Sequence, residues 1–257
     1  MLITPEWAAP PNVRAAMTTR RGGVSVAPWD SLNLGVHVGD SHTSVLQNRR
    51  RVREEAGLPS EPVWLDQVHG TSVVLLDETH AVAAVAGQRP RADAAVTSRE
   101  GVVCSVQVAD CMPVLFAARD GSVVGAAHAG WRGLAGGVLE ATVQAMGAPA
   151  AEIVSWLGPA IGPANFEVGE DVVEAFLRAP APADRAATQA AFVPQPTGKW
   201  LADLYALARL RLAALGVTQV AGGGRCTVAE KDSFFSFRRD GQTGRMAALI
   251  WLQPRRA

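Results

Sequence analysis

Residues 114–127 read Val-Leu-Phe-Ala-Ala-Arg-Asp-Gly-Ser-Val-Val-Gly-Ala-Ala, which is two apolar runs separated by a turn. An Asp-Gly pair between two apolar runs is the strongest local indication of a β-hairpin. We therefore expect antiparallel strands at 114–117 and 123–127, joined through Arg119, Asp120 and Gly121.

The predicted hairpin brings Cys111 and His128 together at its open end. If the turn is centred on Arg119 and Asp120, the two residues face each other directly, and if it is centred on Asp120 and Gly121 they are diagonal neighbours. Either register puts them on one face, with Cβ atoms about 5 Å or about 7–8 Å apart. For an arbitrary pair, the usual interpretation is a buried thiol beside a hydrogen-bonded core histidine.

Three neighbours favour a functional site over that structural interpretation. Asp110 adds a carboxylate where an apolar strand would not place one. His128 leads into a glycine-flanked helix start at 129–133, whose free N–H groups and Arg132 suit an anionic ligand. His69 lies in Gln-Val-His-Gly, at a turn between two predicted strands.

Together, His69, Cys111 and His128 have the chemistry of a zinc site. Neutral imidazoles and a thiolate are preferred zinc ligands, and three protein ligands leave the fourth tetrahedral position open for catalysis. The three residues are too far apart in sequence to match a compact ligand motif, so the spacing alone is a weak signal.

The remaining elements follow from apolar periodicity and from glycines that end helices. We expect helices at 44–56, 131–146, 171–177 and 200–215, and a short one at 184–191 within an Ala- and Pro-rich surface excursion at 178–198. We expect strands at 63–65, 73–76, 102–108, 153–157, 234–237 and 246–252, and a rigid loop at 158–163. This irregular alternation predicts an α+β domain with mixed β-sheets flanked by helices.

The composition is that of an ordinary folded protein. Hydrophobic residues make up 48% of the 257 residues and charged residues 19%, which excludes general disorder. Net charge is zero, so no overall field favours nucleic acid, and no apolar stretch is long enough for a membrane span or a secretory signal, which predicts a cytoplasmic protein. Three cysteines, Cys104, Cys111 and Cys226, argue against a disulfide scaffold, and Cys104 and Cys226 are read as buried or structural thiols.

Several motifs closely resemble the YfiH, or laccase-domain, family. They are Gly-Gly-Val-Ser at 22–25, Ser-Leu-Asn-Leu-Gly at 31–35, Gln-Val-His-Gly at 67–70, Ala-Asp-Cys-Met-Pro-Val-Leu-Phe at 109–116, His-Ala-Gly-Trp-Arg-Gly at 128–133, Gly-Pro-Ala-Ile-Gly-Pro at 158–163, Phe-Glu-Val-Gly at 166–169, Arg-Cys-Thr at 225–227, Phe-Phe-Ser-Phe-Arg-Arg-Asp at 234–240 and Thr-Gly-Arg-Met at 243–246.

The resemblance implies one domain over residues 1–257, with a fold similar to the toxin-type cysteine deamidases. It also implies a zinc site at His69, Cys111 and His128. The implied activity is phosphorolysis of purine nucleosides (adenosine, inosine, guanosine and methylthioadenosine), together with adenosine deamination. Some bacterial relatives are linked to peptidoglycan precursor editing, and older naming makes members multicopper polyphenol oxidases.

The residue inventory tests the copper oxidase name. Such an enzyme needs an electron-transfer copper and a histidine-rich three-copper cluster, but the histidines number five in all: His37, His42, His69, His80 and His128. One His₂Cys site can still take copper, so copper in a preparation would not establish oxidase activity.

The nucleoside hypothesis assigns further residues to the pocket. Phosphate would be held by Arg132, the helix start near Gly130 and Arg20, while Asn33 and Gln67 are substrate contacts within the motifs. Asp110 is the candidate proton carrier, or else a structural partner of Arg132 or of the backbone. Arg238, Arg239 and Arg245 are as consistent with bracing the closing hairpin as with binding substrate.

Two further classes of function stay open. Without metal, the Cys111 thiolate and the His128 base would make an amidase, which suits the toxin-like fold and cell-wall editing. A binding module for nucleosides or for a protein partner would show no turnover of adenosine with phosphate. The sequence does not indicate an oligomeric state.

Overall fold

The predicted hairpin forms the centre of a six-stranded mixed sheet. The computed structural model describes residues 1–178 and 184–254. In spatial order the strands of this sheet are β12 (Gln219–Gly222), β8 (Ile153–Leu157), β6 (Met112–Ala118), β7 (Val124–Ala129), β4 (Ala94–Thr97) and β3 (Val73–Leu75). The two outer pairs are parallel and the inner pairs antiparallel.

Two smaller sheets accompany it. A four-stranded antiparallel sheet consists of β1 (Leu2–Ile3), β2 (Val13–Thr18), β13 (Met246–Leu252) and β5 (Val103–Val108), in that order. A three-stranded one consists of β10 (Phe192–Pro194), β11 (Trp200–Ala202) and β9 (Glu167–Val168). The α+β class with mixed sheets, predicted from the sequence, is confirmed.

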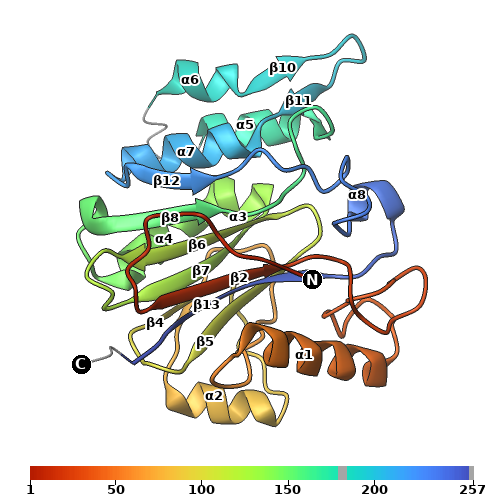
Figure 1. The fold of residues 1–257 in the computed structure, drawn as a ribbon. Helices are drawn as coiled ribbons and strands as arrows, with labels where there is room; N and C mark the ends of the chain where they lie inside the picture. Colours follow the sequence, from red (N-terminus) through yellow and green to blue (C-terminus); the bar gives the residue numbers. More distant parts are fainter. Residues whose placement is uncertain (179–183, 255–257) are drawn as a thin grey trace.

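The described helices lie outside the two larger sheets (Figure 1). They are α1 (His42–Ala56), α2 (Glu78–Val85), α3 (Trp131–Gly136), α4 (Val138–Met146), α5 (Glu170–Arg178), α6 (Arg185–Ala190), α7 (Leu204–Ala214) and α8 (Phe237–Asp240), with a 3₁₀ turn at Ala150–Glu152. None of these helices has the length and apolarity to cross a bilayer.

Burial on both faces explains why β6 is apolar throughout. Val114 and Phe116 belong to the core shared with α4, α5 and α7, whereas Leu115 and Ala117 belong to the core against the four-stranded sheet. Successive strand residues point to opposite faces, so a strand covered on both sides needs apolar residues at every position. The two large sheets therefore pack face to face, with α1 covering the outer face of the four-stranded sheet.

The hairpin register is the second of the two predicted alternatives. Pro113 pairs with His128 and Met112 with Ala129, so Cys111 is a diagonal neighbour of His128 on the same face. That face is the one turned toward the four-stranded sheet.

Two predicted elements are interrupted by local backbone signals. The helix predicted at 131–146 is split into α3 and α4 by Gly137, whose φ of 104° a helix cannot contain. The helix predicted at 200–215 begins only at Leu204, because Asp203 caps its first turn and the residues before it form β11.

Two predicted strands are wrong. Around Val63, only an isolated bridge to Cys104 is present instead of a strand at 63–65. Phe234 and Phe235 are fully buried in a loop, and α8 begins at Phe237. These two apolar side chains fill the end of the core, and the described residues form no strand at this point.

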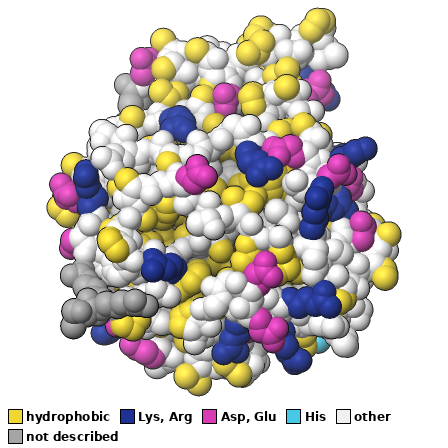
Figure 2. Space-filling view, viewed as in Figure 1, with side chains coloured by type: hydrophobic (Ala, Val, Ile, Leu, Met, Phe, Trp, Pro, Cys, Tyr) yellow, Lys and Arg dark blue, Asp and Glu magenta, His cyan; other side chains and the backbone are white. Residues whose placement is uncertain are grey.

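The excursion predicted at 178–198 contains regular elements in its described portion. Its described portion contains α6, capped by Asp184 inside the predicted 184–191 helix, and then β10. Positions 179–183 of the predicted excursion lie outside the described residues. On the molecular face drawn in Figure 2, basic and acidic side chains are interspersed and are not gathered by sign.

Candidate active site

The structure brings His69, Cys111 and His128 together at the open end of the β6–β7 hairpin, in the middle of the six-stranded sheet. Their ligand atoms all lie within 4.8 Å of one another. Cys111 Sγ is 3.7 Å from His69 Nε2, and the two imidazole rings meet edge to face with centroids 4.8 Å apart. His69 adopts a left-handed backbone conformation with φ 61°, which turns the chain at this point.

A buried carboxylate, Asp93, holds this cluster in place. It directly precedes β4, and its Oδ1 accepts a 2.9 Å hydrogen bond from His128 Nδ1, which leaves Nε2 of that ring free to act as a ligand. The same carboxylate accepts backbone N–H bonds from His69 and Gly70 at 2.8 and 2.7 Å. Burial would raise the pKa of Asp93, but the hydrogen bonds from His128 and Gly70 outweigh it and lower that pKa.

Sequence reasoning missed Asp93, although the signal was present. The residue interrupts the apolar run 92–96, in the same way that Asp110 precedes an apolar strand. A lone carboxylate in a buried strand needs donors to offset its desolvation, and those donors here are the metal-ligand candidates and their neighbours.

The donor types of the cluster suit a zinc ion, and one separation between its ligand atoms can be compared with tetrahedral geometry. With Zn–S of about 2.3 Å and Zn–N of about 2.0 Å, tetrahedral angles place sulfur and nitrogen about 3.6 Å apart. The observed 3.7 Å between Cys111 Sγ and His69 Nε2 agrees with that geometry. Gly130 leaves the room that the cluster needs, since a Cβ there would lie 2.8 Å from Cys111 Sγ and 3.1 Å from His69 Cδ2.

Cys111 and His128 strongly influence each other's protonation. Burial would raise the pKa of the Cys111 thiol, but the adjacent His128 and His69 outweigh burial and lower it to about 6. Burial would lower the pKa of His128, but Cys111 and Asp93 outweigh burial and raise it to about 9. When no metal is bound, the pair is therefore a thiolate beside an imidazolium at neutral pH.

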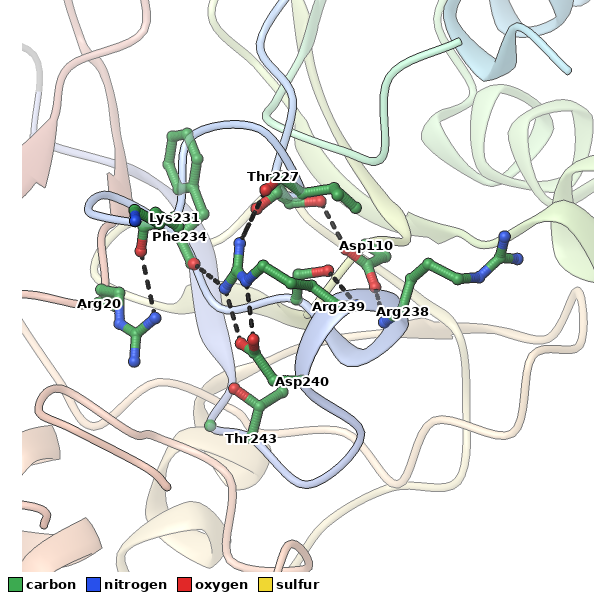
Figure 3. Close-up of polar contacts among 12 residues, drawn as sticks. Arg20, Asp110, Thr227, Lys231, Phe234, Arg238, Arg239, Asp240 and Thr243 are labelled. Carbon is green, nitrogen blue, oxygen red and sulfur yellow. Dashed lines mark hydrogen bonds and ion pairs between the residues drawn. The ribbon is translucent and has the colours of Figure 1, made fainter. Parts of the chain in front are cut away.

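Asp110 connects the strand that carries Cys111 to the C-terminal loop (Figure 3). Its carboxylate accepts hydrogen bonds from Thr227 Oγ1 at 2.5 Å and from the Arg238 backbone N–H at 2.6 Å. Its φ of 88° aims it at this loop. Asp110 thus has the structural role considered above, with Thr227 and Arg238 as partners in place of Arg132.

Arg239 fastens the same loop internally (Figure 3). Its guanidinium donates to the carbonyl oxygens of Thr227 and Phe234 and pairs with Asp240 at 2.6 Å. This is the bracing role that the sequence left open for Arg239.

A cavity of about 650 Å³ opens beside the cluster. It is lined by the three ligand candidates, by aromatic residues, and by more cationic than anionic side chains. The charged and titratable residues lining it, apart from the ligand candidates, are His37, Arg89, Arg132, Arg238 and Arg245, together with the carboxylates Asp66 and Asp110.

Two of the predicted substrate contacts line this cavity. Arg132 stacks on the Trp131 ring at 4.3 Å. The Gln67 amide makes a two-point contact with the Gln107 backbone, donating to its oxygen at 2.8 Å and accepting from its N–H at 2.7 Å. Gln67 therefore faces the cavity and also ties its turn to β5.

The other two predicted contacts, Arg20 and Asn33, are not among the described residues that line the cavity. The Arg20 guanidinium binds Asp30 and the Lys231 carbonyl oxygen and lies 4.8 Å over the Phe235 ring. Asn33 is fully buried. Its Oδ1 accepts the backbone N–H of Arg245 at 2.9 Å, so it acts on the cavity indirectly.

The two other cysteines are free thiols. Cys104 is buried in β5, and burial raises its thiol pKa far above the usual range. Cys226 is half-buried and accepts an N–H from Gly162 at 3.2 Å.

The fold and the site define a class: α+β proteins whose mixed sheets carry one His-Cys-His centre in an arginine-lined cavity. This chain belongs to the family described as multi-copper polyphenol oxidoreductase laccase, whose profile matches residues 14–253. It is 53% identical to purine nucleoside phosphorylase of Pseudomonas aeruginosa and 52% identical to purine nucleoside phosphorylase YfiH of Escherichia coli, each over 98% of both chains. The resemblance to YfiH proteins seen in the sequence is confirmed.

Solved structures show the same fold. The Neisseria meningitidis protein NMB0706, assigned to the domain family DUF152, superposes with a TM-score of 0.89 at 50% identity, over 98% of this chain and 99% of its own. YlmD from Geobacillus stearothermophilus superposes with a TM-score of 0.83 at 35% identity, over 95% and 93% of the two chains.

Proposed function

We propose that this protein is a zinc-dependent purine nucleoside phosphorylase that also deaminates adenosine. One observation carries the proposal: the His69, Cys111 and His128 cluster opens onto a cavity rich in arginine. Full-length relatives at about half identity that are named purine nucleoside phosphorylase support it. The substrates proposed are adenosine, inosine, guanosine and methylthioadenosine, with inorganic phosphate.

The cavity has the size and walls for a nucleoside. Its volume of about 650 Å³ lies within the usual range for small-molecule sites. Trp131, Phe166 and Phe237 supply flat apolar surfaces for a purine ring. Arg132 also lines this cavity. Its guanidinium stacks on Trp131 but makes no hydrogen bond or ion pair with another described residue, so its N–H groups are available to a ligand.

Phosphorolysis requires the two substrates to be held side by side. A phosphate oxygen forms a bond to ribose C1′ while the C1′–N bond to the base breaks, and the departing base takes up one proton. The cavity arginines would neutralise the phosphate, and its aromatic walls would keep water from competing for C1′. In deamination, water adds at C6 of adenosine and ammonia leaves.

His69, Cys111 and His128 would hold the zinc ion, which supplies Lewis acidity for activating water. The chain's own contribution is to orient these ligands. Asp93 fixes the His128 ring through Nδ1 and the His69 turn through its backbone N–H.

The test is a product assay with adenosine, in the presence and in the absence of phosphate, that measures adenine, ribose 1-phosphate and inosine separately. We expect adenine and ribose 1-phosphate only with phosphate, and inosine to accumulate without it. With phosphate, ribose 1-phosphate should equal the sum of adenine and hypoxanthine, because the inosine formed is itself a proposed substrate. Ala substitutions at His69, Cys111 and His128 should each abolish turnover. His42→Ala is the matched control because His42 is exposed on α1, outside the cavity. No adenine formation with phosphate at any enzyme concentration would contradict the proposal and would favour a binding module.

The alternative is a metal-free amidase, and one observation favours it. Cys111 would be the nucleophile, His128 the base, and Asp93 the carboxylate that orients His128. The pKa of the Cys111 thiol is lowered to about 6. An enzyme of this class would cleave an amide, such as one in a peptidoglycan precursor.

Metal analysis separates the two functions, because a zinc-bound thiolate is a poor free nucleophile. One zinc per chain and slow alkylation of Cys111 support the phosphorylase. A metal-free protein with a fast-reacting Cys111 supports the amidase. A copper oxidase is disfavoured, since the described residues contain one candidate group of metal ligands and no histidine-rich cluster beside it.

A further inference from the structure

Basic side chains outnumber acidic ones in the lining of the cavity. Four arginines and His37 line it, against the carboxylates of Asp66 and Asp110. Both Asp110 oxygens already accept hydrogen bonds from the C-terminal loop. A cavity walled largely by cations concentrates anionic ligands.

Three of these residues, His37, Arg89 and Arg245, line the cavity and lie close enough to influence one another's charge. Partial burial and the charges of Arg245 and Arg89 lower the pKa of His37, while Asp66 acts in the opposite direction. Neither Arg89 nor Arg245 forms an ion pair with another residue in the described part of the chain. The two unpaired arginine charges are stabilised when an anion binds between them, and an anion there also favours protonation of His37.

Arg245 lines the cavity, and its guanidinium is held by backbone carbonyl oxygens on one side. Its Nη1 donates to the carbonyl oxygens of Thr243 and Gly244, each at 3.0 Å. Its stem packs on Gly35, where a Cβ would lie 2.8 Å from Arg245 Cγ. Within the described residues, Nε and Nη2 donate to no acceptor, and such an edge matches two oxygens of a phosphoryl group.

Arg245 also faces the candidate metal centre. Burial lowers its pKa, whereas the charges of Cys111 and Asp110 raise it. A ligand on this guanidinium would therefore share the cavity with the His-Cys-His cluster, as a reacting phosphate must.

We propose that His37, Arg89 and Arg245 form a binding subsite for a phosphoryl group, with Arg245 as its central donor. The inference deepens the proposed function, because the phosphoryl group is either free inorganic phosphate or the phosphate of a nucleoside monophosphate. It assigns phosphate binding to His37, Arg89 and Arg245 in place of Arg20 and Arg132.

The test is direct binding of inorganic phosphate, measured by calorimetry on the zinc-loaded protein. We expect Arg245→Gln and Arg89→Gln to weaken phosphate binding about tenfold or more, as the loss of a charge-assisted hydrogen bond implies, and Arg245→Lys to restore part of it. Arg50→Gln is the matched control because Arg50 is exposed on α1. Circular dichroism and zinc content should stay at the wild-type level in every variant.

Adenosine 5′-monophosphate distinguishes the two sources. If it displaces phosphate, and binds less tightly to Arg245→Gln, the subsite holds a nucleotide phosphate; if it does neither while phosphate binding depends on Arg245, the subsite serves inorganic phosphate. Absence of phosphate binding to the wild type, or equal binding to all variants, would overturn the subsite.

Activity separates this inference from the proposed function. Phosphorolysis by Arg245→Gln with an unchanged KM for phosphate would overturn the subsite and leave the phosphorylase standing. Arg245-dependent phosphate binding without turnover of any purine nucleoside would overturn the phosphorylase and leave the subsite standing.

Discussion

At the residue scale, Asp93 is the position where the site depends most directly on a carboxylate. It is fully buried and binds His128 Nδ1 and three backbone N–H groups of the His69 turn. Asp93→Asn keeps the volume but replaces an acceptor oxygen by an amide donor and removes the charge. We expect zinc affinity to fall about 10- to 100-fold, as for other changes beside metal ligands, measured by competition with a chromophoric chelator.

The control for Asp93→Asn is a buried polar change away from the cluster. Asn48 is likewise fully buried, in α1, and binds loop backbone atoms. Asn48→Asp should lower stability without a specific change in zinc affinity of the folded fraction. Equal zinc affinity in wild type and Asp93→Asn would refute the orienting role.

Cys111 gives a pH prediction whose sign follows from its lowered pKa. In zinc-free protein the thiolate dominates above a pKa of about 6 and the less reactive thiol below it. The rate of alkylation by iodoacetamide at Cys111 should therefore be flat at neutral pH and fall as the pH decreases through about 6. Cys104 should stay unlabelled at every pH in the folded protein, because it is buried and its pKa is raised. A rate that climbs steadily up to pH 9 would indicate an unperturbed thiol.

At the scale of elements, a buried contact ties the segment between β12 and β13 to Asp110, just before β6. Thr227 Oγ1 donates to Asp110, and both residues are buried. Thr227→Val leaves one carboxylate oxygen without this donor, which should cost about 1.5–3 kcal/mol of unfolding free energy in urea denaturation. Turnover should also fall, since the loop carries Arg238 and Arg245 to the cavity.

Thr243 provides a matched control in the same loop. It is also buried, but its Oγ1 has no hydrogen-bond partner among the described residues. Thr243→Val should therefore leave the unfolding free energy about unchanged or raise it slightly. Equal losses in the two variants would show that the methyl-for-hydroxyl exchange, and not the contact with Asp110, sets the effect.

Elements with strong local signals were predictable from the sequence. The Asp-Gly turn identified the β6–β7 hairpin, and an apolar periodicity ended by Gly57 identified α1. The failures occurred where burial and pairing are decided by distant segments. Phe234 and Phe235 are as apolar as a strand, yet they fill the end of a core and form no strand pairing in the described part of the chain.

Strand geometry and sequence motifs predicted part of the candidate site. Cys111 and His128 followed from strand register, and His69 from its place at a turn between two predicted strands. Arg89 and Arg245 meet at the cavity only because a loop after α2 and the start of β13 converge there. No local pattern encodes that convergence.

At the scale of the whole molecule, the candidate metal centre joins two parts of the chain that differ in burial. His69 comes from an exposed turn before β3, while Cys111 and His128 come from the central hairpin between the two packed sheets. A metal ion shared by these residues would tie the outer turn to the core.

Removal of the metal should therefore destabilise the protein as a whole. A ligand that binds only the folded state stabilises it by RT ln(1 + [L]/Kd), about 2.7 kcal/mol at a free concentration one hundred times Kd. We expect chelator-treated protein to unfold at a lower urea concentration than zinc-loaded protein, with the loss reversed by added zinc. His69→Ala removes one ligand and leaves the hairpin intact, so its unfolding midpoint should respond far less to zinc. Identical midpoints for wild type with and without zinc would mean that the three side chains do not bind the ion tightly in the folded state, and the proposed centre would fall with that result.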